Sequence, residues 1–154
     1  MEPVSREEAL GVLESQPVAH LGIAIEGVPY VTPMSFVMDE DRILFRTMAG
    51  EKLDGIQSNP AVCVEAADYD PATGAWVSVI VRGTAKVVDD PDASQEVVAL
   101  LYRKYEKVMG SPLSGGGGLM PMGGTPYVIA VQIEEVTGMS SGRGIRVRTK
   151  PGRM

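Results

Sequence analysis

Residues 43–53 have the sequence ILFRTMAGEKL, in which an apolar, strand-like run passes through Gly50 into helical spacing. The free N–H groups at the start of a helix, together with the positive end of the helix dipole, favour an anion at such a junction. Arg46, Thr47 and Lys52 would add a guanidinium, a hydroxyl and an ammonium group. The stretch therefore predicts a strand, a helix and a phosphate site between them. The alternative is a strand end whose charges are solvated.

The segment before this junction predicts a hairpin whose second strand is irregular. Residues 18–25 and 28–38 are strand-like runs on either side of a turn at Gly27. Two prolines remove hydrogen-bond donors from the second run, so backbone groups near them are free to meet a ligand. The residues at that place are Thr32, Pro33, Met34 and Ser35.

The whole chain predicts a mainly β fold with short helices. The expected strands are six: residues 18–25, 28–38, 43–47, 62–67, 75–88 and 127–136. Helices are expected from Ser5, which is spaced to be capped against Glu8, after Gly50 up to residues 59–60, and after Asp90. Because most of the strands are joined by hairpins, they favour a small antiparallel barrel over a doubly wound parallel sheet.

The strand at residues 75–88 carries two further signals. Gly83 interrupts it and predicts a β-bulge or a close approach of another backbone. Val79, Ile80 and Val81 make it apolar on both faces, so one face fills the barrel and the other meets a helix or a second subunit. A homodimer explains this pattern most simply.

Composition limits the classes of function. The chain has 154 residues, of which 44% are hydrophobic, which suits one domain, expected over residues 1–142. Residues 143–154 are basic and are expected to form a flexible tail. A net charge of −6 argues against general nucleic-acid binding. The absence of a long apolar run or a signal-peptide pattern predicts a cytoplasmic protein without membrane association.

The reactive side chains are too few for metal or nucleophilic catalysis. His20 is the only histidine and Cys63 the only cysteine, so neither a transition-metal ligand set nor a nucleophile–base pair of ordinary spacing is present. Cys63 is expected to be an inert, buried thiol. The glycine-rich residues 110–124 are expected to form a mobile loop that could act as a lid. A cofactor is therefore expected to carry any chemistry.

Several motifs together resemble the pyridoxamine 5′-phosphate oxidase-like, FMN-binding split-barrel family. They are residues 27–36 (GVPYVTPMSF), 45–47 (FRT) with 50–53 (GEKL), 59–60 (NP), 74–85 (GAWVSVIVRGTA) and 133–138 (IEEVTG). The likeness is strongest to the short actinobacterial-type members and to the nitroimidazole-resistance proteins. It covers residues from about 20 to 138.

The resemblance implies a six-stranded antiparallel split β-barrel that dimerises and holds FMN at the subunit interface. Arg46, Thr47 and Lys52 would hold the phosphate, while the backbone of residues 32–35 would line the isoalloxazine ring. Ser78 would contact the flavin from across the dimer. Glu51 departs from the family pattern, because an acid beside a phosphate is unfavourable unless it points away. Residues 127–138 also lack the tryptophan and arginine that complete the site of the true oxidase.

The function expected from this resemblance is that of an FMN-dependent oxidoreductase. The flavin would take a hydride from a reduced nicotinamide and pass electrons to a small organic acceptor, so no catalytic side chain is assigned. Two alternatives remain open. The first is a reductase of the same fold that uses 8-hydroxy-5-deazaflavin, and the second is a non-catalytic flavin carrier or sensor.

Overall fold

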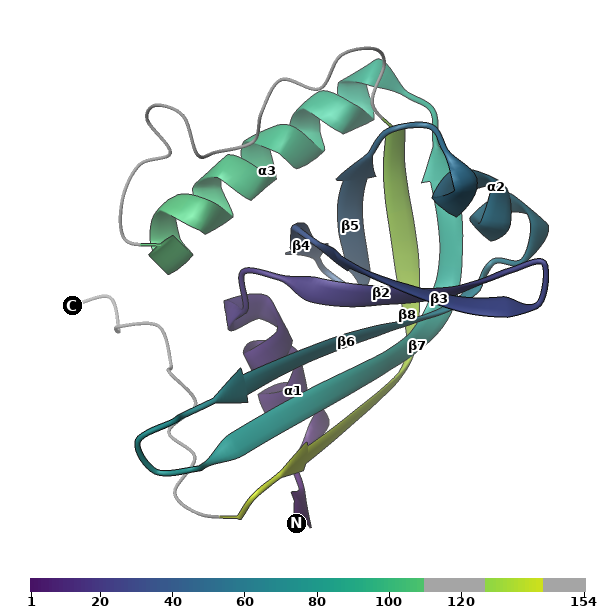
Figure 1. The fold of residues 1–154 in the computed structure, drawn as a ribbon. Coiled ribbons are helices and arrows are strands. Elements are labelled where there is room, and N and C mark those ends of the chain that lie inside the picture. The colour runs from purple at the N-terminus through teal and green to yellow at the C-terminus, as the bar shows by residue number, and fades with distance from the viewer. Residues whose placement is uncertain (110–126, 143–154) are drawn as a thin grey trace.

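One curled antiparallel sheet forms the body of the protein in the computed structural model, which describes residues 1–109 and 127–142 (Figure 1). Its strands are β1 (Glu2–Pro3), β2 (Ala19–Ile25), β3 (Val28–Met34), β4 (Phe36–Asp39), β5 (Arg42–Thr47), β6 (Ala61–Tyr69), β7 (Trp76–Val88) and β8 (Tyr127–Ser140). Its helices are α1 (Arg6–Ser15), α2 (Glu51–Ser58) and α3 (Pro91–Met109). The sheet confirms the predicted mainly β barrel. It has eight strands and not six, because the expected strand 28–38 is divided at Ser35 and β1 is added.

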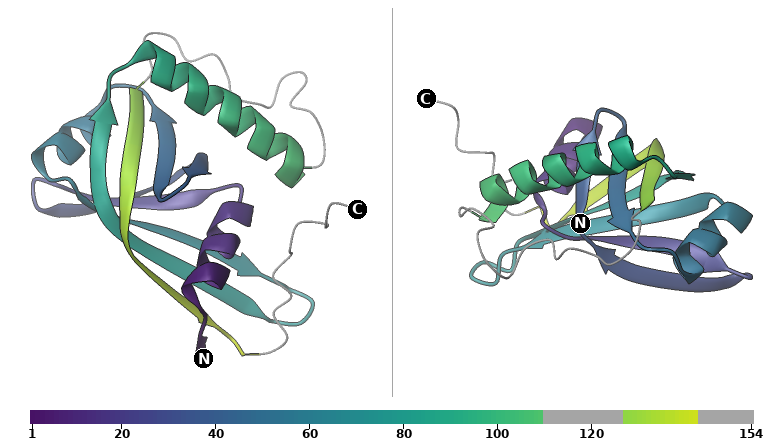
Figure 2. Two further views of the ribbon diagram at one scale, coloured as in Figure 1. Left: turned by 180° about the vertical axis from the view of Figure 1, so that it is seen from behind. Right: turned by 90° about the horizontal axis from the view of Figure 1, so that it is seen from above.

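The division at Ser35 is the split in the barrel. The strand order is β3-β2-β6-β7-β8-β5-β4, so two strands that are consecutive in the chain occupy opposite ends of the order. Ser35 alone separates β3, which pairs with β2, from β4, which pairs with β5. We call Met34, Ser35 and Phe36 the barrel seam. Figure 2 shows the curl of the sheet and the separate positions of the three helices around it.

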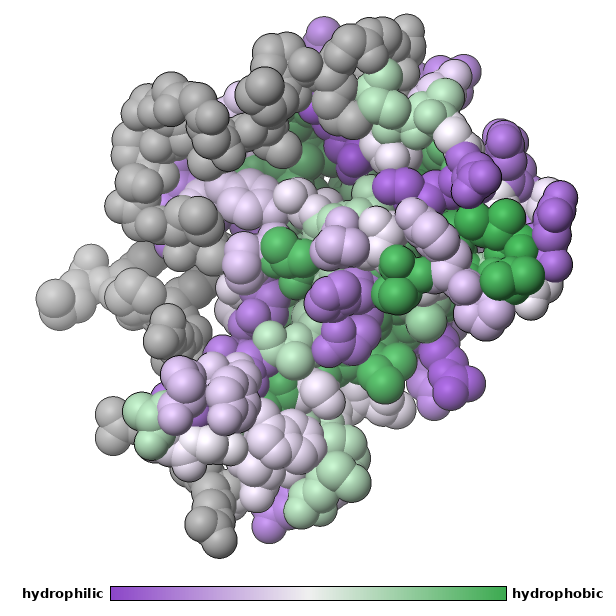
Figure 3. All heavy atoms as spheres, in the orientation of Figure 1, coloured by the Kyte–Doolittle hydropathy of each residue, from purple (hydrophilic) through white to green (hydrophobic). Residues whose placement is uncertain are grey.

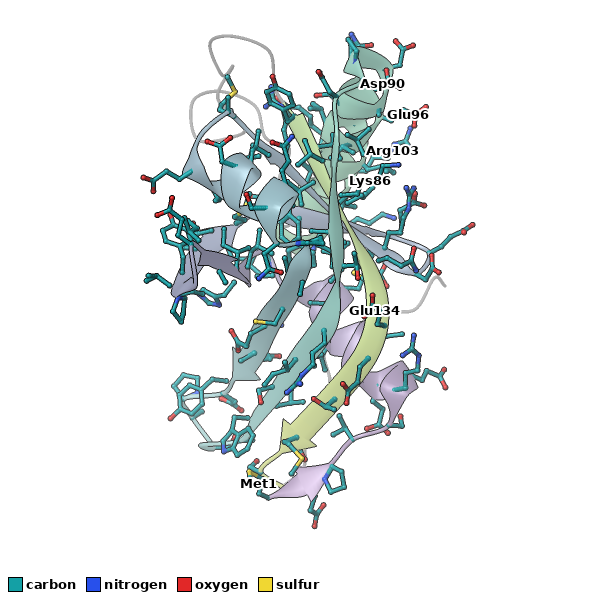
Figure 4. All side chains as sticks on the ribbon, turned by 90° about the vertical axis from the view of Figure 1, so that its right-hand side faces the viewer. Met1, Lys86, Asp90, Glu96, Arg103 and Glu134 are labelled. Atoms are coloured by element: carbon teal, nitrogen blue, oxygen red, sulfur yellow. The ribbon has the colours of Figure 1, made fainter. Side chains whose placement is uncertain are left out.

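The longest strand pair, β7 with β8, contains the bulge predicted at Gly83. Arg82 lies opposite Glu135 but Gly83 lies opposite Ile133, which leaves Glu134 as the extra residue (Figure 4). A Cβ atom on Gly83 would lie 2.2 Å from the carbonyl oxygen of Gln132. Gly83 therefore allows the two backbones to approach closely, as the sequence predicted.

Two apolar clusters lie on the two faces of the sheet. The barrel interior holds Phe45, Leu21 and Ile129 among others, and α1 and α2 each bury residues in it. On the opposite face of β4, β5 and β8, helix α3 packs through a second cluster. The members of this α3 cluster are Val37, Leu44, Val97, Leu101, Tyr105, Val128 and Ala130.

The ends of the helices follow the predicted signals. The side chain of Ser5 accepts a hydrogen bond from the backbone N–H of Glu8 at 3.2 Å, which caps α1. Helix α2 stops at Ser58, and the N–H of Asn59 donates to Gly55 O at 2.8 Å immediately before Pro60.

The prediction for Cys63 was wrong, because its side chain is exposed. Alternation along β6 turns Val62 and Val64 into the barrel and Cys63 outward. A short apolar run does not show which face of its strand is covered, and in the described part of the chain nothing covers the face that carries Cys63.

Candidate functional site

The junction between β5 and α2 is built as the sequence predicted. Strand β5 ends at Thr47, and α2 begins at Glu51 after Gly50, which provides no side-chain cap. The first N–H groups of a helix have no partner within the helix, so they remain available to an anion. Glu51, which fits the family pattern poorly, is exposed and free to point into solvent.

Lys52 links this junction to the segment expected to line a ring. Its Nζ lies 4.0 Å from the sulfur of Met34, which is itself 9% exposed. Burial lowers the pKa of Lys52 from its usual range. A thioether is a weak acceptor and cannot replace an anionic partner for this ammonium. The structure thus brings together one predicted phosphate ligand and one residue of the predicted ring-lining segment.

The side chains of Thr47 and Arg46 point to different faces of β5. Thr47 is buried and alternates with Phe45 of the barrel interior, and its hydroxyl makes a 3.4 Å hydrogen bond to Met48 O. Arg46 alternates with Leu44, which belongs to the α3 cluster. The Nε of Arg46 is buried and has no hydrogen-bond partner in the described part of the chain. A buried N–H without an acceptor is costly, so this guanidinium is poised to take one.

The four residues from 32 to 35 also divide between faces. Thr32 and Met34 stand opposite Leu21 and Ala19, both buried in the barrel. Pro33 is exposed on the outer side of β3. Ser35 belongs to neither strand. Of these four residues, only Thr32 and Met34 therefore direct their side chains toward the barrel interior.

Ser78 lies on the outer face of the sheet. Its neighbours Val77 and Val79 fill the barrel, whereas Ser78 and Ile80 point outward, with Ile80 45% exposed. Val31 is 67% exposed on the same outer side of β3. Figure 3 shows apolar patches separated by polar ones across the visible face of the molecule. Within one chain, Ser78 and the Lys52 junction lie on different sides of the sheet.

Lys104 of α3 is a buried charge that the sequence interpretation missed. Its side chain is 9% exposed, and its Nζ lies 3.3 Å from the centroid of the Phe36 ring without a hydrogen-bond partner among the described residues. Burial lowers the pKa of Lys104 to about 7, although the nearby Glu14 acts to raise it. A helical wheel would have given the signal, because Lys104 is spaced three and seven residues from the apolar Leu101 and Val97.

Tyr105, the next residue, ties α3 to the barrel seam. Its hydroxyl donates a hydrogen bond to Pro17 O at 2.5 Å. Burial raises the pKa of this phenol, and hydrogen bonds with the Ser35 side chain and the Phe36 backbone act to lower it. The Tyr105 hydroxyl therefore links α3 both to the connection before β2 and to the barrel seam.

Neither a membrane span nor a metal cluster is found in the described residues. No helix in 1–109 or 127–142 is both long and apolar enough to cross a bilayer. Those residues also contain no group of three or more His, Cys, Asp and Glu side chains that could hold a metal ion. The glycine-rich loop and the basic tail predicted from the sequence lie outside the described residues.

The divided sheet, with its helices packed against it, is a split β-barrel. Residues 5–140 match the family model described as pyridoxamine 5′-phosphate oxidase, and the protein belongs to that family. The resemblance inferred from the sequence motifs is thereby confirmed.

Known proteins similar to this chain agree in fold. An FAD-binding protein from Mesorhizobium loti has a TM-score of 0.69 at 22% identity, over 90% of this chain and 95% of that chain. An FAD-binding protein from Mycobacterium smegmatis has a TM-score of 0.64 at 25% identity, over 91% of this chain and 98% of that chain. An uncharacterised protein of Rhizobium meliloti (strain 1021) is 32% identical over 80 residues, or 52% of each protein, so the match spans about half the length of that relative.

Proposed function

We propose that this protein is a homodimeric, FMN-binding oxidoreductase that reduces a small organic acceptor at a flavin held between the subunits. The observation that carries the proposal is the approach of Lys52 to Met34 at 4.0 Å, which joins a phosphate-type junction to the seam of the barrel. Two structural relatives are FAD-binding proteins, which supports a flavin.

The residues fit the parts of a flavin nucleotide. Lys52, Thr47 and the free N–H groups at the start of α2 would hold the phosphate. Arg46, whose buried Nε lacks a partner among the described residues, lies on the other face of β5 from Thr47. The backbone of residues 32–35 would face the ring. The chemistry supplied by bound FMN is hydride acceptance and electron transfer, while the chain binds, orients and shields.

The outer face of the sheet is the proposed dimer surface. Val31, Ile80 and the side chain of Cys63 are exposed on it, and Ser78 lies beside them. Exposed apolar side chains on a sheet face are typical of a surface that is covered in the assembly. The family resemblance implies that Ser78 of a second copy contacts the first copy's flavin.

Replacing Lys52 by alanine is expected to weaken FMN binding by roughly 1–3 kcal/mol, the scale of a charge-assisted contact. Riboflavin has the same ring and no phosphate, so its affinity should change much less. Titration calorimetry with both ligands measures the difference. Lys86→Ala is the matched control: it removes an equal charge from an exposed position on β7, beside α3 (Figure 4). Equal losses for FMN and riboflavin in Lys52→Ala would exclude a phosphate contact by Lys52.

Replacing Ile80 by glutamate is expected to convert a dimer into monomers. The new carboxylate would stand opposite Glu65 on β6 and would be desolvated in the interface. Sedimentation velocity measures the change. Tyr102→Glu, at an exposed position of α3, serves as a control that should remain dimeric. A variant that sediments as the wild type does would place the subunit contact elsewhere.

Turnover separates an enzyme from a carrier. With FMN bound under anaerobic conditions, a reduced nicotinamide should bleach the flavin absorbance if the protein is an oxidoreductase. Flavin that stays oxidised would favour a carrier or sensor. Saturable binding of 8-hydroxy-5-deazaflavin in preference to FMN would favour the deazaflavin reductase.

A further inference from the structure

Ser35, the middle residue of the barrel seam, has no strand partner of its own. Strand β3 ends at Met34 and β4 begins at Phe36, so Ser35 lies outside both hydrogen-bonded ladders. Backbone between two ladders is held in place by whatever packs against it. Lys52 of α2 approaches Met34 of the seam, and α3, which lies on the outside of β4, β5 and β8, contacts Ser35 and Phe36.

Two successive residues of α3 make those contacts. The Tyr105 hydroxyl meets the Ser35 side chain and the Phe36 backbone while it donates to Pro17 O. The Nζ of Lys104 lies over the Phe36 ring at 3.3 Å. Polar groups are uncommon on the buried face of a helix. Here two of them face the seam, one at the Phe36 ring and the other at Ser35 and the Phe36 backbone.

We propose that Tyr105 is a positioning residue for the flavin ring, acting through Ser35 to fix the backbone of residues 32–35, with Lys104 supporting it by holding Phe36. The inference rests on the proposed function, because that backbone is expected to face the isoalloxazine. Tyr105 itself does not touch the reacting atoms. Its hydroxyl sets the position of the segment that does.

The test is the Tyr105→Phe variant, which keeps the aromatic packing and removes only the hydroxyl. Since the ring is common to both ligands, FMN and riboflavin affinities should fall together, by about three- to tenfold for the loss of one hydrogen-bonded tie. The absorbance maximum of the bound flavin should also move toward that of free flavin. The second change reports the surroundings of the ring and would not follow from lowered stability alone.

Two controls on the same helix separate positioning from general loosening. Tyr102→Phe removes an exposed hydroxyl and should leave both affinities unchanged. Leu101→Val weakens the packing of α3 in its cluster without removing a contact to Ser35, and should lower the melting temperature more than it lowers flavin affinity. If Leu101→Val weakens both flavins as much as Tyr105→Phe does, the positioning role is wrong.

The remaining outcomes distinguish the inference from the function on which it rests. If the wild type binds flavin, Lys52→Ala selectively weakens FMN, and Tyr105→Phe changes neither affinity nor spectrum, then the inference fails and the proposed function stands. If the wild type binds neither FMN nor riboflavin, both are overturned.

Discussion

A Gly83→Ala variant is expected to be less stable than the wild type by about 3 kcal/mol, because the added methyl group has no space in the native bulge. The new Cβ would lie 2.2 Å from the carbonyl oxygen of Gln132 and 2.9 Å from a methyl carbon of Val131. The first of these atoms belongs to the backbone of β8 and cannot rotate away. Relief requires the β7–β8 pairing itself to shift, and this is the longest pairing of the barrel.

Urea unfolding measures this loss, with Gly11→Ala as the control. Gly11 lies inside α1, is exposed, and has no atom within 4 Å of the position its Cβ would take. Alanine there should raise the free energy of unfolding by about 0.5–1 kcal/mol, through helix propensity alone. A Gly83→Ala variant as stable as the wild type would show that the two strands do not approach as described.

A Lys104→Met variant is expected to be more stable than the wild type by about 3 kcal/mol at pH 6. Lowering the pKa of Lys104 from 10.5 to about 7 corresponds to roughly 5 kcal/mol against the buried ammonium. Its contact with the Phe36 ring returns up to about 2 kcal/mol, so desolvation prevails. Methionine keeps the length of the side chain and removes the charge.

The gain should depend on pH in a defined direction. The folded-state pKa of Lys104 lies below the unfolded value, so between about pH 7 and pH 10.5 the unfolded chain binds more protons and stability rises with pH. The penalty is complete below pH 7, where the lysine is charged in both states. The advantage of Lys104→Met should therefore shrink from pH 7 toward pH 10.5. Lys107→Met, at an exposed position of α3, should show no such trend, and a pH-independent gain in Lys104→Met would contradict the account.

Local signals in the sequence predicted much of the fold. The cap at Ser5, the end of α2 before Pro60 and the bulge at Gly83 each depend on a few adjacent residues, and each is present. The division at Ser35 was anticipated only as an irregular strand. Which neighbour each half joins depends on the closure of the whole sheet, which a single segment does not encode. The prediction that Cys63 is buried failed for the same reason.

The candidate site was harder to predict than the fold. The motif from Arg46 to Lys52 gave the residue types, but alternation along β5 sends Arg46 and Thr47 to opposite faces, and Ser78 lies on the outer face. Because Arg46 and Thr47 are adjacent in the sequence, they were expected to bind the same phosphate, but a single chain does not bring their side chains together. Lys104 was missed because its role depends on Phe36, which is 68 positions away in the sequence and adjacent only in the folded barrel.

Titration calorimetry of the 154-residue wild type with FMN and with riboflavin tests the central claim most directly. The expected result is saturable binding of one FMN per subunit, tighter than riboflavin by about ten- to a hundredfold, because only FMN carries the phosphate for Lys52 and the start of α2. Equal affinities for the two ligands, or no saturable binding of either, would contradict it.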